Sequence, residues 1–175
     1  MWAYVCCGPG KPYANLFLDF PGVDPRILGW QFYKYGMTGF LYYLVNLYEQ
    51  EENWNMDAPK WPERPWNPYS FKTNSDGILM YPGPDMTPLA SIRMENLRDG
   101  IEDYEALNIL AGLAAHLEKQ GGQEAQVAIA KEILAVRPEV AKSWTEYTQE
   151  PERLSNARAD VDDMIVAVTR ALGEL

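Results

Sequence analysis

The stretch that decides the fold is Gly39-Phe40-Leu41-Tyr42-Tyr43-Leu44-Val45. This run is almost continuously apolar, which is typical of a strand buried on both faces, as in a parallel sheet. Such a strand is covered by helices on both sides, because both rows of its side chains leave water. The sequence therefore predicts an α/β fold around this strand.

The residues before this run predict a strand and a helix. Residues 2–7 form a short β-prone run that Gly8-Pro9-Gly10 ends, so neighbours Cys6 and Cys7 are expected on opposite faces of the sheet. Residues 25–35 predict a helix, with Asp24 as its N-cap, Pro25 at its first position and Gly36 after its end. Strand, helix and strand in this order predict a βαβ unit.

The residues after the run predict a long loop and then helices. Residues 50–76 are irregular and rich in Trp, Pro and Asn, and a loop of that length in a compact domain is usually functional. Residues 77–81 predict a third strand. Long helices are expected at three places, with Pro88 opening the first and Thr87 capping it: 88–118, 122–136 and 151–172. Residues 139–149 fit neither a helix nor a strand clearly.

Composition excludes several classes of partner. Asp and Glu outnumber Lys and Arg by 25 to 15, so the formal net charge is −10, which argues against nucleic acid and anionic membrane surfaces. No apolar run approaches about 20 residues, so no membrane-spanning helix is expected. Cysteine and histidine spacing predicts no metal site, and no phosphate-binding glycine loop or other cofactor motif is present. Cysteine usage does not indicate the compartment.

Three motifs in chain order resemble the catalytic domain of glycoside hydrolase family 123. They are Tyr33-Lys34-Tyr35-Gly36-x-x-Gly39-Phe40-Leu41-Tyr42-Tyr43, then Asp76-Gly77-x-Leu79-x-Tyr81-Pro82-Gly83, and Ser91-Ile92-Arg93-Met94-Glu95-x-Leu97-Arg98-Asp99-Gly100-Ile101-Glu102-Asp103-Tyr104-Glu105. The third is long and specific, and the resemblance covers residues 1 to about 110. It implies a (β/α)8 TIM-type barrel and a retaining β-N-acetylgalactosaminidase type of activity, in which the 2-acetamido group of the substrate is the nucleophile.

The resemblance also predicts what the chain lacks. The family's catalytic pair is an adjacent Asp and Glu in an Asp-Glu-Pro context, and this chain has no Asp-Glu dipeptide. We therefore expect a fragment: strands six to eight of the barrel in residues 1–119, and an α-helical extension in residues 120–175. The catalytic carboxylates would come from the missing N-terminal part of the same barrel, and no catalytic residue is assigned here. The family resemblance suggests an extracytoplasmic location.

Candidate sugar-binding residues lie on or after the predicted strands, because barrel active sites form at the C-terminal strand ends. Flat aromatic rings stack on the apolar faces of sugars, and an amide or guanidinium can bind sugar hydroxyls. The candidate substrate-binding residues are Tyr4, Tyr43, Asn46, Tyr48, Trp54, Tyr81 and Arg93. The aromatic rings could instead fill the interior, and Asn46 could tie down the following loop.

A dense group of charges on the first long helix has a structural interpretation. Glu95 and Glu102 stand three residues before and four residues after Arg98, so ion pairs along one helix face are expected. Glu102 and Asp103 point about 100° apart on a helix and cannot converge on one glycosidic bond.

Two functions follow from the sequence. The first is a fragment of a glycoside hydrolase acting on β-linked N-acetylhexosamine, with a carbohydrate as its partner. The alternative is a non-catalytic carbohydrate-binding or structural module derived from such a barrel.

Overall fold

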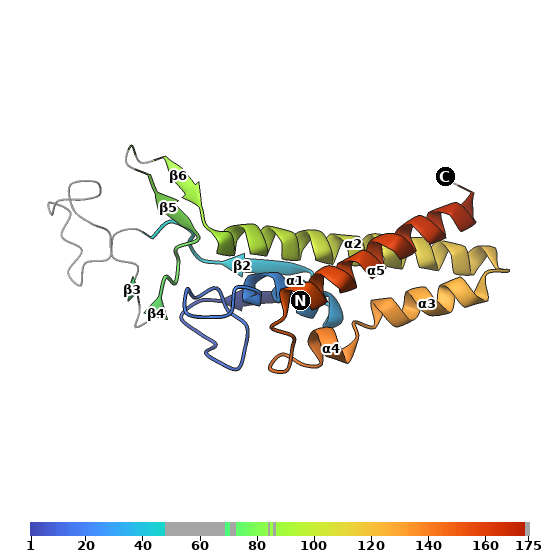
Figure 1. The fold of residues 1–175 in the computed structure, drawn as a ribbon, viewed down its shortest axis with the longest axis horizontal. Coiled ribbons are helices and arrows are strands. Elements are labelled where there is room, and N and C mark those ends of the chain that lie inside the picture. The colour runs from blue at the N-terminus through green and yellow to red at the C-terminus, as the bar shows by residue number, and fades with distance from the viewer. Residues whose placement is uncertain (48–68, 71–72, 84, 86, 174–175) are drawn as a thin grey trace, which may run out of the picture.

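The computed structural model describes residues 1–47, 69–70, 73–83, 85 and 87–173. It is elongated, with short strands at one end and a long helical hairpin at the other (Figure 1). The elements in chain order are β1 (Trp2–Val5), α1 (Asp24–Lys34), β2 (Gly39–Tyr42), β3 (Tyr69–Ser70), β4 (Thr73–Asn74), β5 (Met80–Pro82), β6 (Pro88–Ala90), α2 (Ile92–Gln120), α3 (Glu124–Leu134), α4 (Pro138–Ala141) and α5 (Pro151–Leu172). The described strands form three separate two-stranded sheets and close no barrel.

The first three elements confirm the predicted βαβ unit. β1 and β2 are parallel, with Trp2 opposite Gly39 and Val5 opposite Tyr42, and α1 connects them. β2 is shorter than the apolar run 39–45 that predicted it, because the chain leaves the sheet after Tyr42. The next residues run antiparallel to the segment before β5: Leu47 N–H donates to the Gly77 carbonyl at 2.9 Å, and Leu79 N–H donates to the Val45 carbonyl at 2.8 Å.

The start of α2 differs from the prediction. Pro88 lies in β6, which pairs antiparallel with β5, and the helix begins at Ile92. Ser91 is the N-cap, since its hydroxyl accepts the N–H of Met94 at 3.2 Å. Proline is compatible with an edge strand as well as with the first turn of a helix, so Pro88 alone did not distinguish them. The predicted cap Thr87 was therefore wrong.

The predicted N-cap role of Asp24 was also wrong. Asp24 is the first residue of α1, Val23 is the N-cap, and no side chain caps this helix. The Asp24 carboxylate is instead buried and accepts from Lys11 Nζ at 2.7 Å and from the Tyr147 hydroxyl at 3.1 Å. Asp24 therefore forms an ion pair with Lys11 rather than a helix cap. The residues next to Asp24 in sequence do not indicate this partner.

Cys6 and Cys7 do not face opposite sides of a sheet as predicted. β1 ends at Val5, and both residues belong to the turn that follows it. Their Sγ atoms lie 3.7 Å apart. Side chains alternate between the two faces of a sheet only within a strand. Because β1 ends at Val5, the prediction of opposite faces does not apply to Cys6 and Cys7.

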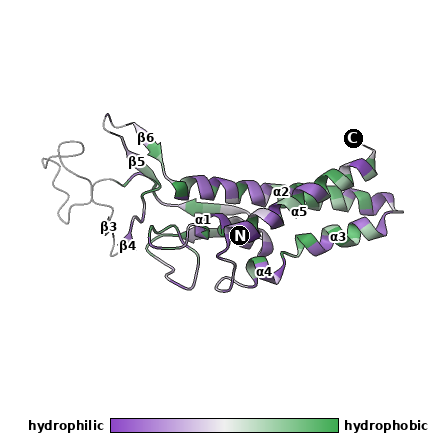
Figure 2. Cartoon of the chain, in the orientation of Figure 1, coloured by the Kyte–Doolittle hydropathy of each residue, from purple (hydrophilic) through white to green (hydrophobic). Residues whose placement is uncertain are grey.

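The helical half packs along α2, which contacts α1, α3 and α5. The last helix, α5, buries one apolar stripe, since Leu154, Val161 and Val168 are fully buried. Hydrophobic and hydrophilic residues alternate along α2 and α5 in Figure 2, as expected for helices with one buried face. None of the helices among the described residues is both long and apolar enough to cross a membrane.

The two halves of the chain share buried polar contacts. Lys34, at the end of α1, donates to the carbonyls of Val136 at 3.0 Å and Ala141 at 2.7 Å. Gln31 is 1% exposed and donates to the Ser143 carbonyl at 3.1 Å. These contacts join residues 136–143 to α1, so the tail packs directly on the βαβ unit. The division into domains 1–119 and 120–175 stays a prediction.

Candidate functional site

The carboxyl ends of β1 and β2 bring three chain segments together. Because the two strands are parallel, the residues that follow Val5 and Tyr42 lie at the same edge of the sheet. The third segment is Asp76-Gly77, which the antiparallel contacts of residues 45–47 hold beside the end of β2. In Figure 1 this edge faces the β5–β6 hairpin.

A buried carboxylate with two phenols forms the centre of this edge. Asp76 is 1% exposed, and its Oδ1 accepts from the Tyr42 hydroxyl at 2.9 Å while its Oδ2 accepts from the Tyr43 hydroxyl at 3.2 Å. The Tyr42 oxygen also accepts the N–H of Gly77 at 2.6 Å. The two rings pack edge to face with centroids 5.5 Å apart. We call Tyr42, Tyr43 and Asp76 the phenol–carboxylate cluster.

Burial and hydrogen bonds act in opposite directions on the pKa of Asp76. Loss of water around the carboxylate raises its pKa, and the hydrogen bonds from Tyr42 and Tyr43 lower it in part. Burial is also the main reason that the pKa of the Tyr42 phenol is raised. The pKa of Tyr4 is raised first by desolvation, then by Cys6 and Asp76. Tyr4 therefore lies within electrostatic range of the cluster.

The loop that carries Asp76 is held by a buried arginine. Arg93 is 6% exposed, and its guanidinium donates to the carbonyls of Leu16, Ser75 and Ile78. Gly77 has a φ of +75°, and a Cβ there would lie 2.6 Å from the Tyr43 hydroxyl oxygen. Only glycine combines this backbone conformation with so close a neighbour. The Asp-Gly step therefore positions the carboxylate under the two phenols.

The structure brings some of the predicted sugar-binding residues together. Tyr4, Tyr43 and Asn46 are exposed at the carboxyl-end edge, and Asn46 pairs with Ile78 beside Gly77. Tyr81 is half-buried, with its hydroxyl 3.5 Å from Arg93 Nη2.

The other predicted residues are placed differently. Arg93 is buried among backbone carbonyls rather than exposed at the edge, although it adjoins Tyr81. Tyr48 and Trp54 lie outside the described residues. All seven assignments stay predictions.

Sequence reasoning missed two members of the cluster, Asp76 and Tyr42. Asp76 stands in the second motif, directly before the apolar run 77–81, and Tyr42 precedes a second tyrosine at the end of an apolar strand. The available signal was a pair of phenols at the end of one predicted strand, together with a carboxylate and a glycine at the start of the next predicted strand. Their contact depends on a separation of 34 residues in sequence, which no local pattern encodes.

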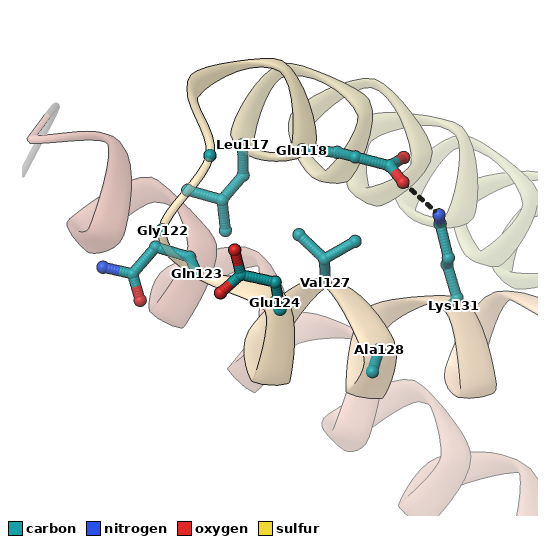
Figure 3. A pocket seen from close by; sticks show the side chains of 9 residues that line it. Leu117, Glu118, Gly122, Gln123, Glu124, Val127, Ala128 and Lys131 are labelled. Atoms are coloured by element: carbon teal, nitrogen blue, oxygen red, sulfur yellow. Dashed lines mark hydrogen bonds and ion pairs between the residues drawn. The ribbon is translucent and has the colours of Figure 1, made fainter.

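Two cavities among the described residues lie away from this edge. One, of about 230 Å³, lies at the turn between α2 and α3, where Glu118 and Lys131 form an ion pair across its rim (Figure 3). The other, of about 260 Å³, lies between α1 and α2 and is lined mainly by apolar side chains such as Phe32, Phe40 and Leu97. Within the described ranges no three His, Cys, Asp or Glu side chains gather as a metal site would require.

The raised pKa of Asp76 predicts a pH dependence of stability. A carboxyl group with a folded-state pKa above its unfolded value of about 3.9 stabilises the fold fully below that value, and this contribution is lost as pH rises through the folded-state pKa. Asp76→Asn removes the titration. We expect the free energy of unfolding of the wild type minus that of the variant to decrease as the pH rises from 4 to 7.

Urea unfolding of both proteins at the two pH values measures this difference. Asp99→Asn, which removes a carboxylate that is 38% exposed on α2 and pairs with Arg98, serves as the control for the loss of one carboxylate. A difference between wild type and Asp76→Asn that is constant or rises with pH would contradict the raised pKa.

Comparison with models of known protein families gives a match. The family model described as "Glycoside hydrolase 123, catalytic domain" matches residues 1–110, which include β1, α1, β2, the phenol–carboxylate cluster and the first part of α2. A search of curated proteins finds no match. The family model covers more than half of the 175 residues, and the chain belongs to the glycoside hydrolase 123 catalytic domain family.

Proposed function

We propose that this chain supplies part of the sugar-binding face of a glycoside hydrolase that acts on β-linked N-acetylhexosamine. Membership of the family implies a glycoside hydrolase and a carbohydrate substrate. The observation that carries the finer proposal is the exposed aromatic and amide edge around Asp76 at the carboxyl ends of two parallel strands. In this proposal residues 1–119 are the portion of a (β/α)8 barrel that contains strands six to eight.

The chemistry of the edge supports sugar binding. Tyr4 and Tyr43 present ring surface to water, with exposed fractions of 50% and 36%. Sugars combine apolar C–H faces with hydroxyl groups, so they need flat rings beside polar donors and acceptors. Asn46 supplies both a donor and an acceptor at the same edge. Asp76 keeps the Tyr43 ring in one orientation, which reduces the entropy lost on binding.

The catalytic pair is proposed to lie outside these 175 residues. The chain lacks an Asp-Glu dipeptide, and the carboxylate at the edge is buried beneath two phenols rather than free to protonate a leaving group. Its role would then be to hold the sugar, while a β-N-acetylgalactosaminidase-like, substrate-assisted reaction uses carboxylates from the rest of the barrel.

Binding of methyl N-acetyl-β-galactosaminide, followed by NMR titration of the full chain, tests the proposal. We expect weak binding by the wild type and a loss of roughly five- to tenfold in Tyr43→Ala, because one stacking ring contributes about 1 kcal/mol. Tyr35→Ala is the control, since Tyr35 is similarly exposed at 38% but precedes β2 rather than following it. Equal losses in both variants, or no binding by the wild type, would contradict the proposal.

Hydrolysis of p-nitrophenyl N-acetyl-β-galactosaminide by the same chain tests the second part of the proposal. We expect no turnover. Turnover that survives repurification would show that the chain carries its own catalytic groups.

One observation favours the alternative, a non-catalytic carbohydrate-binding module. Helix α5 of the tail joins α2 through partly buried pairs, such as Arg158 Nη1 with Asp103 at 3.1 Å, which are typical of a unit that folds by itself. A cooperative thermal transition of the isolated chain, with sugar binding and no turnover, would support this alternative. A broad, non-cooperative transition would support a barrel fragment instead.

A further inference from the structure

The turn after β1 places two thiols side by side. Cys6 N–H donates to the Gly8 carbonyl at 2.9 Å, which ends the strand at Val5. Asn15 is fully buried, and its side-chain N–H₂ group donates to the Cys6 carbonyl at 3.0 Å and the Pro9 carbonyl at 2.9 Å. The backbone of the turn is therefore held from inside the protein, and both sulfurs lie on its outer side.

The sulfur positions suit a bridge through one atom better than a direct bond. The Sγ atoms are 3.7 Å apart, whereas a disulfide requires about 2.05 Å. Adjacent Cα atoms are about 3.8 Å apart, below the usual disulfide range of about 4.4–6.8 Å, so a ring between neighbours is strained and readily reduced. A larger atom bonded to both sulfurs avoids this strain.

Both thiols can be reached, and the pKa of the Cys7 thiol is raised. Cys7 is exposed and Cys6 is half-exposed. The hydrogen bond and charge of Cys6 raise the pKa of Cys7, and Asp76 adds to the effect. Reagents that need a thiolate therefore react slowly at Cys7. The short distance between the two sulfurs favours a reagent that binds both of them.

We propose that Cys6 and Cys7 form a preorganised dithiol site for trivalent arsenicals. An organoarsenic(III) oxide loses its oxygen, two As–S bonds form, and the two thiol protons leave with the oxygen as one water molecule. Arsenic stays trivalent, so no oxidant or reductant is required. The two thiols follow β1 at the same edge as the proposed sugar-binding residues, but their chemistry does not require sugar binding, and the test does not use a sugar.

The second sulfur makes the complex long-lived. Once one As–S bond has formed, the second bond forms within the molecule, so the local thiol concentration exceeds that of a free competitor. A single thiol loses its arsenical to excess glutathione, whereas the pair retains it. A competing dithiol can remove the arsenical, because it also forms two As–S bonds.

The experiment treats the reduced full chain with phenylarsine oxide in excess glutathione and measures intact mass. We expect one adduct, with the mass of the reagent less one water, and its removal by 2,3-dimercaptopropanol. Cys6→Ser and Cys7→Ser should each release the reagent roughly a hundredfold faster. Thermal melting of both variants confirms that they fold, since exposed serines replace thiols of similar size.

Two results would overturn the proposal. Single-thiol variants that keep the adduct as long as the wild type would show that no bridge forms. A folded wild type that takes up the reagent no faster than the urea-unfolded chain would show that the turn does not preorganise the sulfurs.

Discussion

Replacing Gly29 by alanine is expected to destabilise the protein by at least about 4 kcal/mol, in the extreme range for a single substitution. Gly29 on α1 faces Gly100 on α2, and a Cβ on Gly29 would overlap the carbonyl group of Gly100. In the reverse direction, a Cβ on Gly100 would lie 2.6 Å from the Arg26 carbonyl oxygen. Both obstacles are backbone atoms, which no rotamer change can move, so the two helices would have to separate.

Urea unfolding followed by circular dichroism measures this effect against a matched control. Gly112 also lies in a helix, α2, but a Cβ there meets nothing within 4 Å. Gly112→Ala should therefore raise the free energy of unfolding by up to about 1 kcal/mol, since alanine favours the helix. A Gly29→Ala variant within about 1 kcal/mol of the wild type would show that α1 and α2 do not approach this closely.

Replacing Asp103 by alanine is expected to lower the free energy of unfolding by about 3–5 kcal/mol, because it leaves buried charge without a partner. Asp103 is 1% exposed and accepts three side chains from two other helices: Arg26 Nε at 2.7 Å, Trp30 Nε1 at 2.7 Å and Arg158 Nη1 at 3.1 Å. Asp103→Ala removes the acceptor of the Arg26 guanidinium and of the Trp30 indole N–H, while Arg158 keeps its pair with Asp162 at 2.9 Å. We expect a large fall in the midpoint of thermal unfolding.

The neighbouring Glu102 provides the control for Asp103. Its side chain is 60% exposed and pairs with Arg98 at 3.5 Å, so Glu102→Ala should change stability by no more than about 0.5 kcal/mol. Asp103→Asn keeps an acceptor oxygen without the charge and should fall between the two. Equal effects of Glu102→Ala and Asp103→Ala would contradict the buried network.

The Asp103 network also explains part of the longest family motif. Sequence reasoning expected this charged helix face to be structural, and the pairs of Arg98 with Glu95 and Glu102 confirm the i,i+3 and i,i+4 interpretation. Those pairs are exposed, however, and contribute little. Asp103 is the acidic residue of this group that we expect to contribute most to stability, because it is buried and contacts α1 and α5. Its partner Arg158 lies beyond the family match, so the tail completes an interaction that begins within residues 1–110.

Local pattern determined the order and type of most elements. The continuous apolar run at 39–45 predicted β2, the expected helix 151–172 matches α5, and Pro25 marked the first turn of α1. These features depend on neighbours within about one turn or one strand, so their signal is complete in the sequence itself. Three consecutive motifs in order were sufficient to indicate the family.

Tertiary structure alone decided what each polar and small residue does. Asp24 resembles a helix cap but binds Lys11 and Tyr147, and Cys6 and Cys7 resemble strand neighbours but share one side of a turn. Asp76 is the centre of the candidate site because the fold brings it into contact with Tyr42 and Tyr43, which are distant in sequence. A carboxylate or thiol takes whichever partner lies within about 3–4 Å, and that distance is set by how the chain packs, not by its local spacing.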